Sequence, residues 1–227
     1  MTKKFLSALL AMILLFSTAA LAEGKLKVTD KNLFIFPGEN TGYFYAKVEN
    51  VGDAPAGIDS GNLVIFSEDD EILLSKSYIT TLPNYVILDA GDYLYIKEFL
   101  WDNSLKNVSI GDYKLSIPTT KRNRTVSKLP CEATFDLTDT DGFNNYVYVT
   151  FTNTTEEVLH NLYIVAALYD TEGTLIFVDS ASLSSISVHP NSTITVEIYV
   201  DRDLMDYYAA NGITPAAVDA MVCITNE

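Results

Sequence analysis

Two pairs of tyrosines carry the side chains best suited to binding a ligand. Tyr43 and Tyr45 lie two positions apart in one segment, as Tyr93 and Tyr95 do in another. Residues two apart share one face of a strand, so all four are predicted to share an outer face if the two segments are neighbouring strands. Exposed tyrosines offer a large contact area and a polar hydroxyl, which suits a sugar ring or a protein partner. Two alternatives stay open: the tyrosines stabilise the sheet as cross-strand pairs, or residues 25–36 cover them.

Two acidic stretches are candidates for calcium, because hard cations prefer several oxygen ligands within one loop. They are SEDDE at 67–71 and DLTDTDGFNN at 136–145. Asp139, Asp141 and Asn144 would supply oxygens in the second stretch. The full calcium loop with its closing glutamate is absent, however, and Asp-Gly is an ordinary turn dipeptide. We therefore expect no metal site and keep calcium as the weaker alternative.

The chain contains two cysteines, Cys131 and Cys223. In an exported protein we expect them to form one disulfide, which would close a loop of about 90 residues and contribute roughly 4 kcal/mol. The alternatives are two buried thiols or an unpaired reactive thiol. Neither cysteine lies in a C-x-x-C pattern or beside a histidine, so the sequence does not favour a metal or redox site.

Groups that could carry out catalysis are few. His160 and His189 lie in predicted loops, and neither is spaced from another residue as in a known catalytic or metal-binding motif. The sequence lacks G-x-S-x-G, H-E-x-x-H and phosphate-binding glycine patterns. Paired carboxylates could converge in space, but a sandwich of about 100 residues leaves little room for a deep cleft. The sequence therefore predicts no enzyme and no cofactor, and a small hydrolase is the least favoured alternative.

Residues 1–22 have the pattern of a secretory signal peptide. Lys3 and Lys4 precede an apolar run that ends in small residues at Ala20-Leu21-Ala22. Cleavage near Ala22 would release a secreted chain without a membrane span and would change the formal charge from -15 to -17, since two lysines are lost. Such an acidic surface repels nucleic acid and anionic lipid, which leaves an unknown protein or a glycan as the expected partner.

An internal repeat organises the rest of the chain. With a constant shift of 103, YFYAKVEN at 43–50 aligns with YVYVTFTN at 146–153, and further on the shift becomes 100. Two copies of about 100 residues predict two domains, at 23–117 and 130–227. The polar segment 118–129 between them is predicted to be a solvated linker.

Alternating apolar and polar residues within each copy predict short antiparallel strands, separated by turn signals such as Asp-Gly and His-Pro-Asn. The predicted fold class is therefore all-β: two tandem immunoglobulin-like antiparallel β-sandwich domains, with a short helix near the C-terminus, where residues 202–218 are predicted as helix and turn. Gly212 is expected to stop that helix, with Pro215 beyond it. Trp101, the only tryptophan, is expected to act as a packing plug.

The second copy resembles the FxLYD domain family, which consists of small all-β modules of bacterial exported proteins. Leu168, Tyr169 and Asp170 match the motif, whereas Ala166 stands where the family has phenylalanine. The first copy is more divergent, and its corresponding residues are Leu63, Ile65, Phe66 and Ser67. The resemblance covers 145–200 well and 42–97 weakly, and it implies a non-enzymatic extracellular module with no known ligand residues.

The motif itself has a structural interpretation. Leu168 is expected in the buried row of a strand, and Tyr169 outward or at the sandwich edge. Asp170 is expected to begin a turn and to accept hydrogen bonds from backbone N–H groups. The sequence thus predicts an exported, non-catalytic tandem β-sandwich protein that mediates protein–protein interaction, with carbohydrate binding by the tyrosine face as the alternative.

Overall fold

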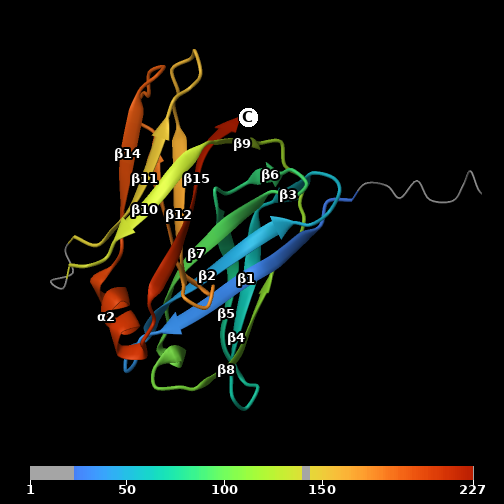
Figure 1. Ribbon diagram of the computed structural model, residues 1–227. Helices are drawn as coiled ribbons and strands as arrows, with labels where there is room; N and C mark the ends of the chain where they lie inside the picture. Colours follow the sequence, from blue (N-terminus) through green and yellow to red (C-terminus); the bar gives the residue numbers. More distant parts are fainter. Residues whose placement is uncertain (1–22, 140–143, 227) are drawn as a thin grey trace, which may run out of the picture.

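The computed structural model describes residues 23–139 and 144–226, and this part of the chain is all-β with one α-helix (Figure 1). We call residues 23–117 the first half and residues 130–226 the second half. The first half contains β1 (Leu26–Ile35), β2 (Thr41–Asn50), β3 (Ala56–Ile58), β4 (Ser60–Ser67), β5 (Ile72–Leu82), β6 (Val86–Leu88), β7 (Tyr93–Trp101), the 3-10 helix η1 (Asn103–Leu105) and β8 (Ile110–Ser116). β9 (Thr125–Leu129) precedes the second half, which contains β10 (Cys131–Asp136), β11 (Tyr146–Thr152), β12 (Leu162–Asp170), β13 (Leu175–Leu183), β14 (Thr193–Tyr199), α2 (Arg202–Asn211) and β15 (Pro215–Asn226). The predicted signal peptide lies outside the described residues.

The two halves have the same strand order. In the first half, β1-β2-β7 and β5-β4-β8 form two three-stranded layers, which join where the end of β5 pairs with β7. In the second half, β10-β11-β14 and β13-β12-β15 lie in the same order. Apolar residues fill the space between the layers because they alternate with polar ones along each strand, as in β11. The repeat seen in the sequence is therefore a repeat of topology.

A buried asparagine holds the same corner in each half. Asn50 is 0% exposed and Asn153 is 1% exposed. The Asn50 amide donates to the carbonyls of Ala54 and Leu88, at 2.8 and 3.0 Å. The Asn153 amide donates at the corresponding places, to Glu157 and Val188, both at 2.8 Å. Identical hydrogen bonds at a shift of 103 to 100 support the alignment of the two copies.

The predicted turn after the Leu-Tyr-Asp motif is confirmed. The Asp170 carboxylate accepts from the backbone N–H groups of Glu172 and Thr174, at 2.9 and 2.8 Å. Ser67, at the same place in the first half, accepts from Asp69 and Glu71 through its hydroxyl oxygen. Leu168 is buried, as expected. The Asp170 end of the motif therefore shapes a turn.

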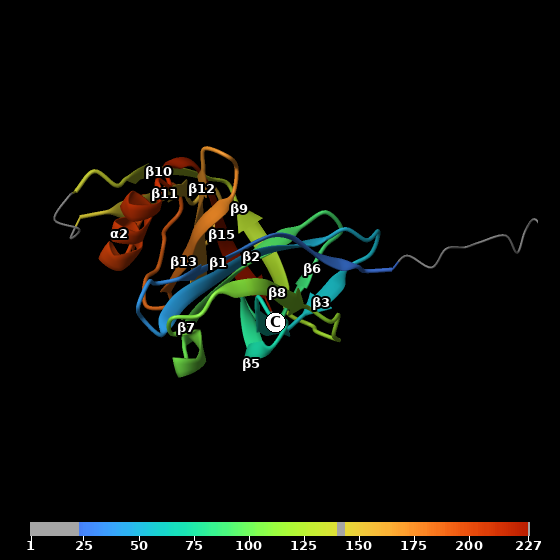
Figure 2. The same ribbon diagram turned by 90° about the horizontal axis from the view of Figure 1, so that it is seen from below.

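The two halves share a sheet, contrary to the prediction of independent sandwiches. The second six-stranded sheet has the order β13-β12-β15-β9-β6-β3, so it contains strands from both halves. Ile87 of β6 pairs in parallel with Thr125 of β9, and β9 pairs with β15 along its whole length. Figure 2 shows that β13 of the second half lies beside β1 and β2 of the first half.

The prediction of a solvated linker at 118–129 is wrong. The backbone N–H of Thr120 donates to the carbonyl of Gly57, and the Arg122 guanidinium contacts the Asp59 carboxylate. The segment then becomes β9, in which Lys128 bonds to Asp92 at 3.0 Å. Arg122 and Lys128 thus pair with carboxylates of the first half, and the Arg124 guanidinium donates to the Thr225 hydroxyl of β15, which helps to hold this polar segment in a sheet.

The C-terminal helix begins and ends where the sequence indicates. The Asp201 side chain caps α2 by accepting from the Asp203 N–H, at 2.8 Å. Gly212 adopts a left-handed conformation with φ 66°, which ends the helix. β15 then begins at Pro215, within the range predicted as helix and turn. Within the described residues, no helix has the length and apolar character needed to cross a membrane.

Candidate functional site

The four predicted tyrosines share one sheet face, but the second half covers it. β2 and β7 are adjacent and antiparallel, as predicted. Tyr45 is 1% exposed and Tyr95 is 0% exposed, whereas Tyr43 and Tyr93 are partly buried. The prediction that this face is exposed is therefore wrong. The alternation of side chains along each strand identified the shared face correctly, but it gave no information on which other layer packs against that face.

The tyrosine hydroxyls converge on one carboxylate of the second half. Tyr93 and Tyr95 donate to the Asp219 Oδ2 atom, at 2.8 and 2.7 Å. The hydroxyls of Tyr95 and Tyr169 are 2.8 Å apart. The motif tyrosine of the second half thus lies in the contact between the halves, and the hydroxyls of Tyr93, Tyr95 and Tyr169 each have a partner.

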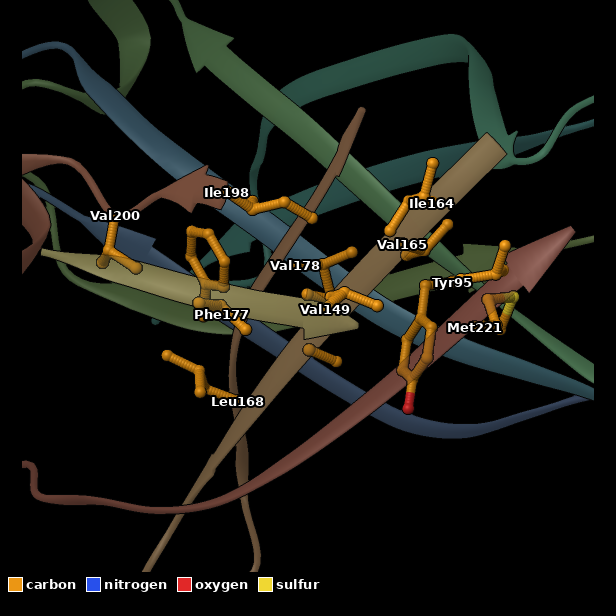
Figure 3. Packing of buried hydrophobic residues seen from close by; sticks show 14 of the residues in the cluster. Tyr95, Val149, Ile164, Val165, Leu168, Phe177, Val178, Ile198, Val200 and Met221 are labelled. Carbon is orange, nitrogen blue, oxygen red and sulfur yellow. The ribbon is translucent and has the colours of Figure 1, made fainter. Parts of the chain in front are cut away.

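An apolar cluster surrounds these hydrogen bonds. Figure 3 shows Tyr95 beside Met221 of β15, within the core cluster of the second half. The rings of Tyr45 and Phe177 meet edge to face with centroids 6.3 Å apart. At the rim, Lys97 Nζ lies 2.6 Å from the Asp179 carboxylate. Apolar contacts, hydroxyl hydrogen bonds and an ion pair therefore fix how the halves are placed.

Burial also sets the ionisation of this cluster. Burial raises the pKa of Tyr169 to about 12, although its hydrogen bond with Tyr95 lowers it. Burial and the contacts with Tyr169 and Asp219 raise the pKa of Tyr95 further. The interface therefore requires protonated, neutral tyrosines, because a phenolate there would be desolvated beside a carboxylate.

The aromatic residues that remain exposed lie at the far end of β7. Trp101 is 76% exposed and Phe99 is 45% exposed. The prediction of Trp101 as a packing plug is therefore wrong. Trp101 pairs with Thr41 of β2, so the two side chains share a face of the sheet.

Thr41 also lines a groove of about 400 Å³ between the β1–β2 hairpin and α2. The residues lining it are Phe36, Pro37, Glu39, Thr41, Asp203, Asp206, Tyr207, Ala210 and Asn211. The rings of Phe36 and Tyr207 lie 5.8 Å apart within it. Sequence reasoning missed this groove because its walls come from both halves, and only the order of apolar and acidic residues in α2 hinted at it.

The calcium candidates do not form a site in the described part of the chain. Asp139 Oδ2 accepts from the backbone N–H and the side-chain amide of Asn144, both at 2.8 Å. Asp141 lies outside the described residues. Among those that are described, no group of three His, Cys, Asp or Glu side chains is placed to hold a metal ion. His160 and His189 are exposed, and His160 Nδ1 lies 3.1 Å from Ser187 Oγ.

The structure holds Cys131 and Cys223 as free thiols and does not contain the predicted disulfide. The two residues belong to different layers: Cys131 begins β10, and Cys223 lies in β15 between β12 and β9. Cys131 Sγ donates to the Ala220 carbonyl at 3.6 Å. Burial raises the pKa of Cys223 to about 12, so this thiol is a poor nucleophile at neutral pH.

Comparisons with known proteins supply no family. No family model matches the chain, and no curated protein matches it. Among solved structures, the chain is similar to red sea bream transglutaminase, with 12% identity and a TM-score of 0.24. The match covers 88% of this chain and 30% of that one. At that TM-score the likeness carries no argument about fold or activity.

Proposed function

We propose that the chain is an exported, non-catalytic protein whose two halves, each an immunoglobulin-like sandwich of the FxLYD type, form one scaffold for protein–protein contact. The tyrosine interface and the shared sheet support this proposal, because they hold the β1–β2 hairpin and α2 in a fixed relation. A surface built from both halves can present a preformed groove, which lowers the entropic cost of binding.

The observation that carries the proposal is the combination of aromatic and acidic side chains at this junction. Phe36 and Tyr207 supply apolar rings, and Glu39, Asp203 and Asp206 supply negative charge. Arginine and lysine side chains stack on aromatic rings and pair with carboxylates. The groove therefore suits a protein segment that presents a basic residue beside an apolar one.

Selection from a phage-displayed library of random peptides tests this directly. Peptides enriched on the immobilised mature chain should carry Arg or Lys next to an aromatic or aliphatic residue. Asp206→Lys, which reverses a charge in the groove, should weaken their binding at least tenfold. Ile186→Ala is a matched control, because Ile186 is 48% exposed and lies at the opposite end of β14 from α2. Equal binding by both variants would refute the groove as the site.

Carbohydrate binding is the second candidate, and the exposure of Trp101 favours it. The tyrosine face is no longer the proposed platform, because Tyr45 and Tyr95 are buried. A tryptophan that is 76% exposed offers a ring on which a sugar can stack. Glycan-array signal that is lost in Trp101→Ala and kept in Ile186→Ala would support this alternative over a peptide partner.

A further inference from the structure

Strand β14 ends a sheet in the second half. Its neighbour on one side is β11, and in the described part of the chain no strand pairs with its other side. β14 is seven residues long and reads TITVEIY, a sequence with strong β-propensity. An unpaired edge of this kind presents a row of backbone N–H and C=O groups to another chain.

Hydrogen bonds at both ends show which residues face this edge. The carbonyl of Ser192 accepts from Asn153, and the N–H of Val200 donates to Asn145, so the even-numbered residues point to β11. In an antiparallel strand the backbone groups of successive residues point to opposite sides. Thr193, Thr195 and Glu197 therefore direct their backbone N–H and C=O groups to the open edge.

The corresponding edge in the first half is protected. The start of β7 pairs with the end of β5, through Tyr95 with Leu82 and Ile96 with Thr81. Beyond that point Lys76 reaches over, with its Nζ 3.4 Å from the Phe99 carbonyl. Pairing and a lysine are two common means of blocking an edge. β14 has neither device, and it contains no lysine or proline.

We propose that a second copy of this chain pairs with β14 in antiparallel fashion about a two-fold axis at Val196. This register pairs residues 194–198 with the same segment of the second copy and joins the layers into a sheet of order β10-β11-β14-β14-β11-β10. Glu197 then lies opposite Thr195 of the second copy, and Ile194 lies opposite its Ile198. No like charges face each other, and apolar residues meet on the side that continues the cores.

The dimer is independent of the groove at α2 and goes beyond the proposed function. Its assembly must overcome repulsion between two acidic chains, so it should strengthen as salt screens the charge. Sedimentation velocity of the mature chain should therefore show a species of twice the monomer mass. This dimer should appear at a lower protein concentration in 0.5 M than in 0.05 M sodium chloride, two conditions whose ionic strengths differ by about tenfold. A monomer at every salt and protein concentration overturns the proposal.

Two variants of one residue locate the contact. Thr195→Pro removes an N–H that points to the edge and leaves the β11 ladder complete, so it should abolish the dimer. Thr195→Ala removes the γ-methyl group and the hydroxyl that contacts Thr150 but keeps the backbone N–H, so it should leave the dimer intact. Loss of the dimer in both variants, or in neither, contradicts pairing through the backbone.

Hydrogen exchange on the unaltered chain gives the same answer without a mutation. The amides of Thr195 and Glu197 should exchange slowly at high protein concentration and quickly on dilution. Amides of β11 should exchange at a rate that does not depend on concentration, because they are paired within the chain. Concentration-independent exchange at Thr195 would overturn the proposal even if Thr195→Pro fails to fold.

Discussion

The outer face of β1-β2-β7 in the first half and that of β10-β11-β14 in the second are the same surface in two copies, yet only the first is covered. Tyr95 of the first half corresponds to Thr195, and Lys97 corresponds to Glu197. Tyr95 is 0% exposed and bonded to Asp219, whereas Thr195 is exposed and bonded to Thr150. A tyrosine pattern on a strand therefore predicts a contact surface without saying whether the partner is a ligand or the rest of the chain.

The largest expected difference between the two faces comes from truncating Tyr95. Tyr95→Ala removes a fully buried ring and leaves the Asp219 carboxylate without that donor, so it should lower the free energy of unfolding by about 3–5 kcal/mol. Thr195→Ala, the matched change in the second half, should alter it by about 0.5 kcal/mol or less. Chemical denaturation measures both, and similar losses would contradict the assignment of one face as buried.

Unlike the Tyr95 and Thr195 pair, the corner asparagines Asn50 and Asn153 should contribute equally to the stability of the two halves. Asn50→Ala and Asn153→Ala each leave buried carbonyls without a donor, at a cost of about 1–3 kcal/mol. Denaturation of the two variants under one set of conditions tests this. A cost in only one half would show that the two corners are not equivalent.

Alkaline pH should weaken the covered face. The folded-state pKa of Tyr169 is about 12, above its ordinary value near 10, so the stabilisation is complete below about pH 10 and is lost as pH rises towards 12. Tyr95 acts in the same direction. Thermal unfolding from pH 8 to 11 should show a falling midpoint. Tyr169→Phe should make this fall less steep, and an unchanged slope in that variant would argue against ionisation of Tyr169 at the interface.

The smallest effect should come from the rim ion pair. Lys97 Nζ lies 2.6 Å from Asp179 Oδ2, but the two side chains are 26% and 28% exposed. A double-mutant cycle with Lys97→Ala and Asp179→Ala should give a coupling of about 0.2–1 kcal/mol, which falls as salt is added. A larger coupling that does not depend on salt would mean that the interface rests on charge more than on the tyrosine cluster.

Local features of the sequence predicted the local structure well. Alternation in 146–152 predicted β11, Asp170 predicted its turn, and Gly212 predicted the end of α2. Each of these depends on neighbours close in the chain. The repeat also indicated that the two halves would share one strand order, whatever that order is.

Contacts between the halves could not be predicted in this way. Residues 118–129 are polar, and only the positions of Asp59 and Asp92 in the fold explain why Arg122 and Lys128 are held there. Trp101 was expected to act as a packing plug, but it is 76% exposed, and β5 pairs with β7 only at Tyr95 and Ile96. The groove was missed for the same reason, since Phe36 and Tyr207 come from different halves.

Differential scanning calorimetry of the mature chain tests most directly whether the two halves form one folded body. The shared sheet and the buried tyrosines predict a single transition whose calorimetric and van't Hoff enthalpies agree. Two separate transitions, or early proteolytic cleavage at 118–129 that releases two resistant fragments, would contradict the account.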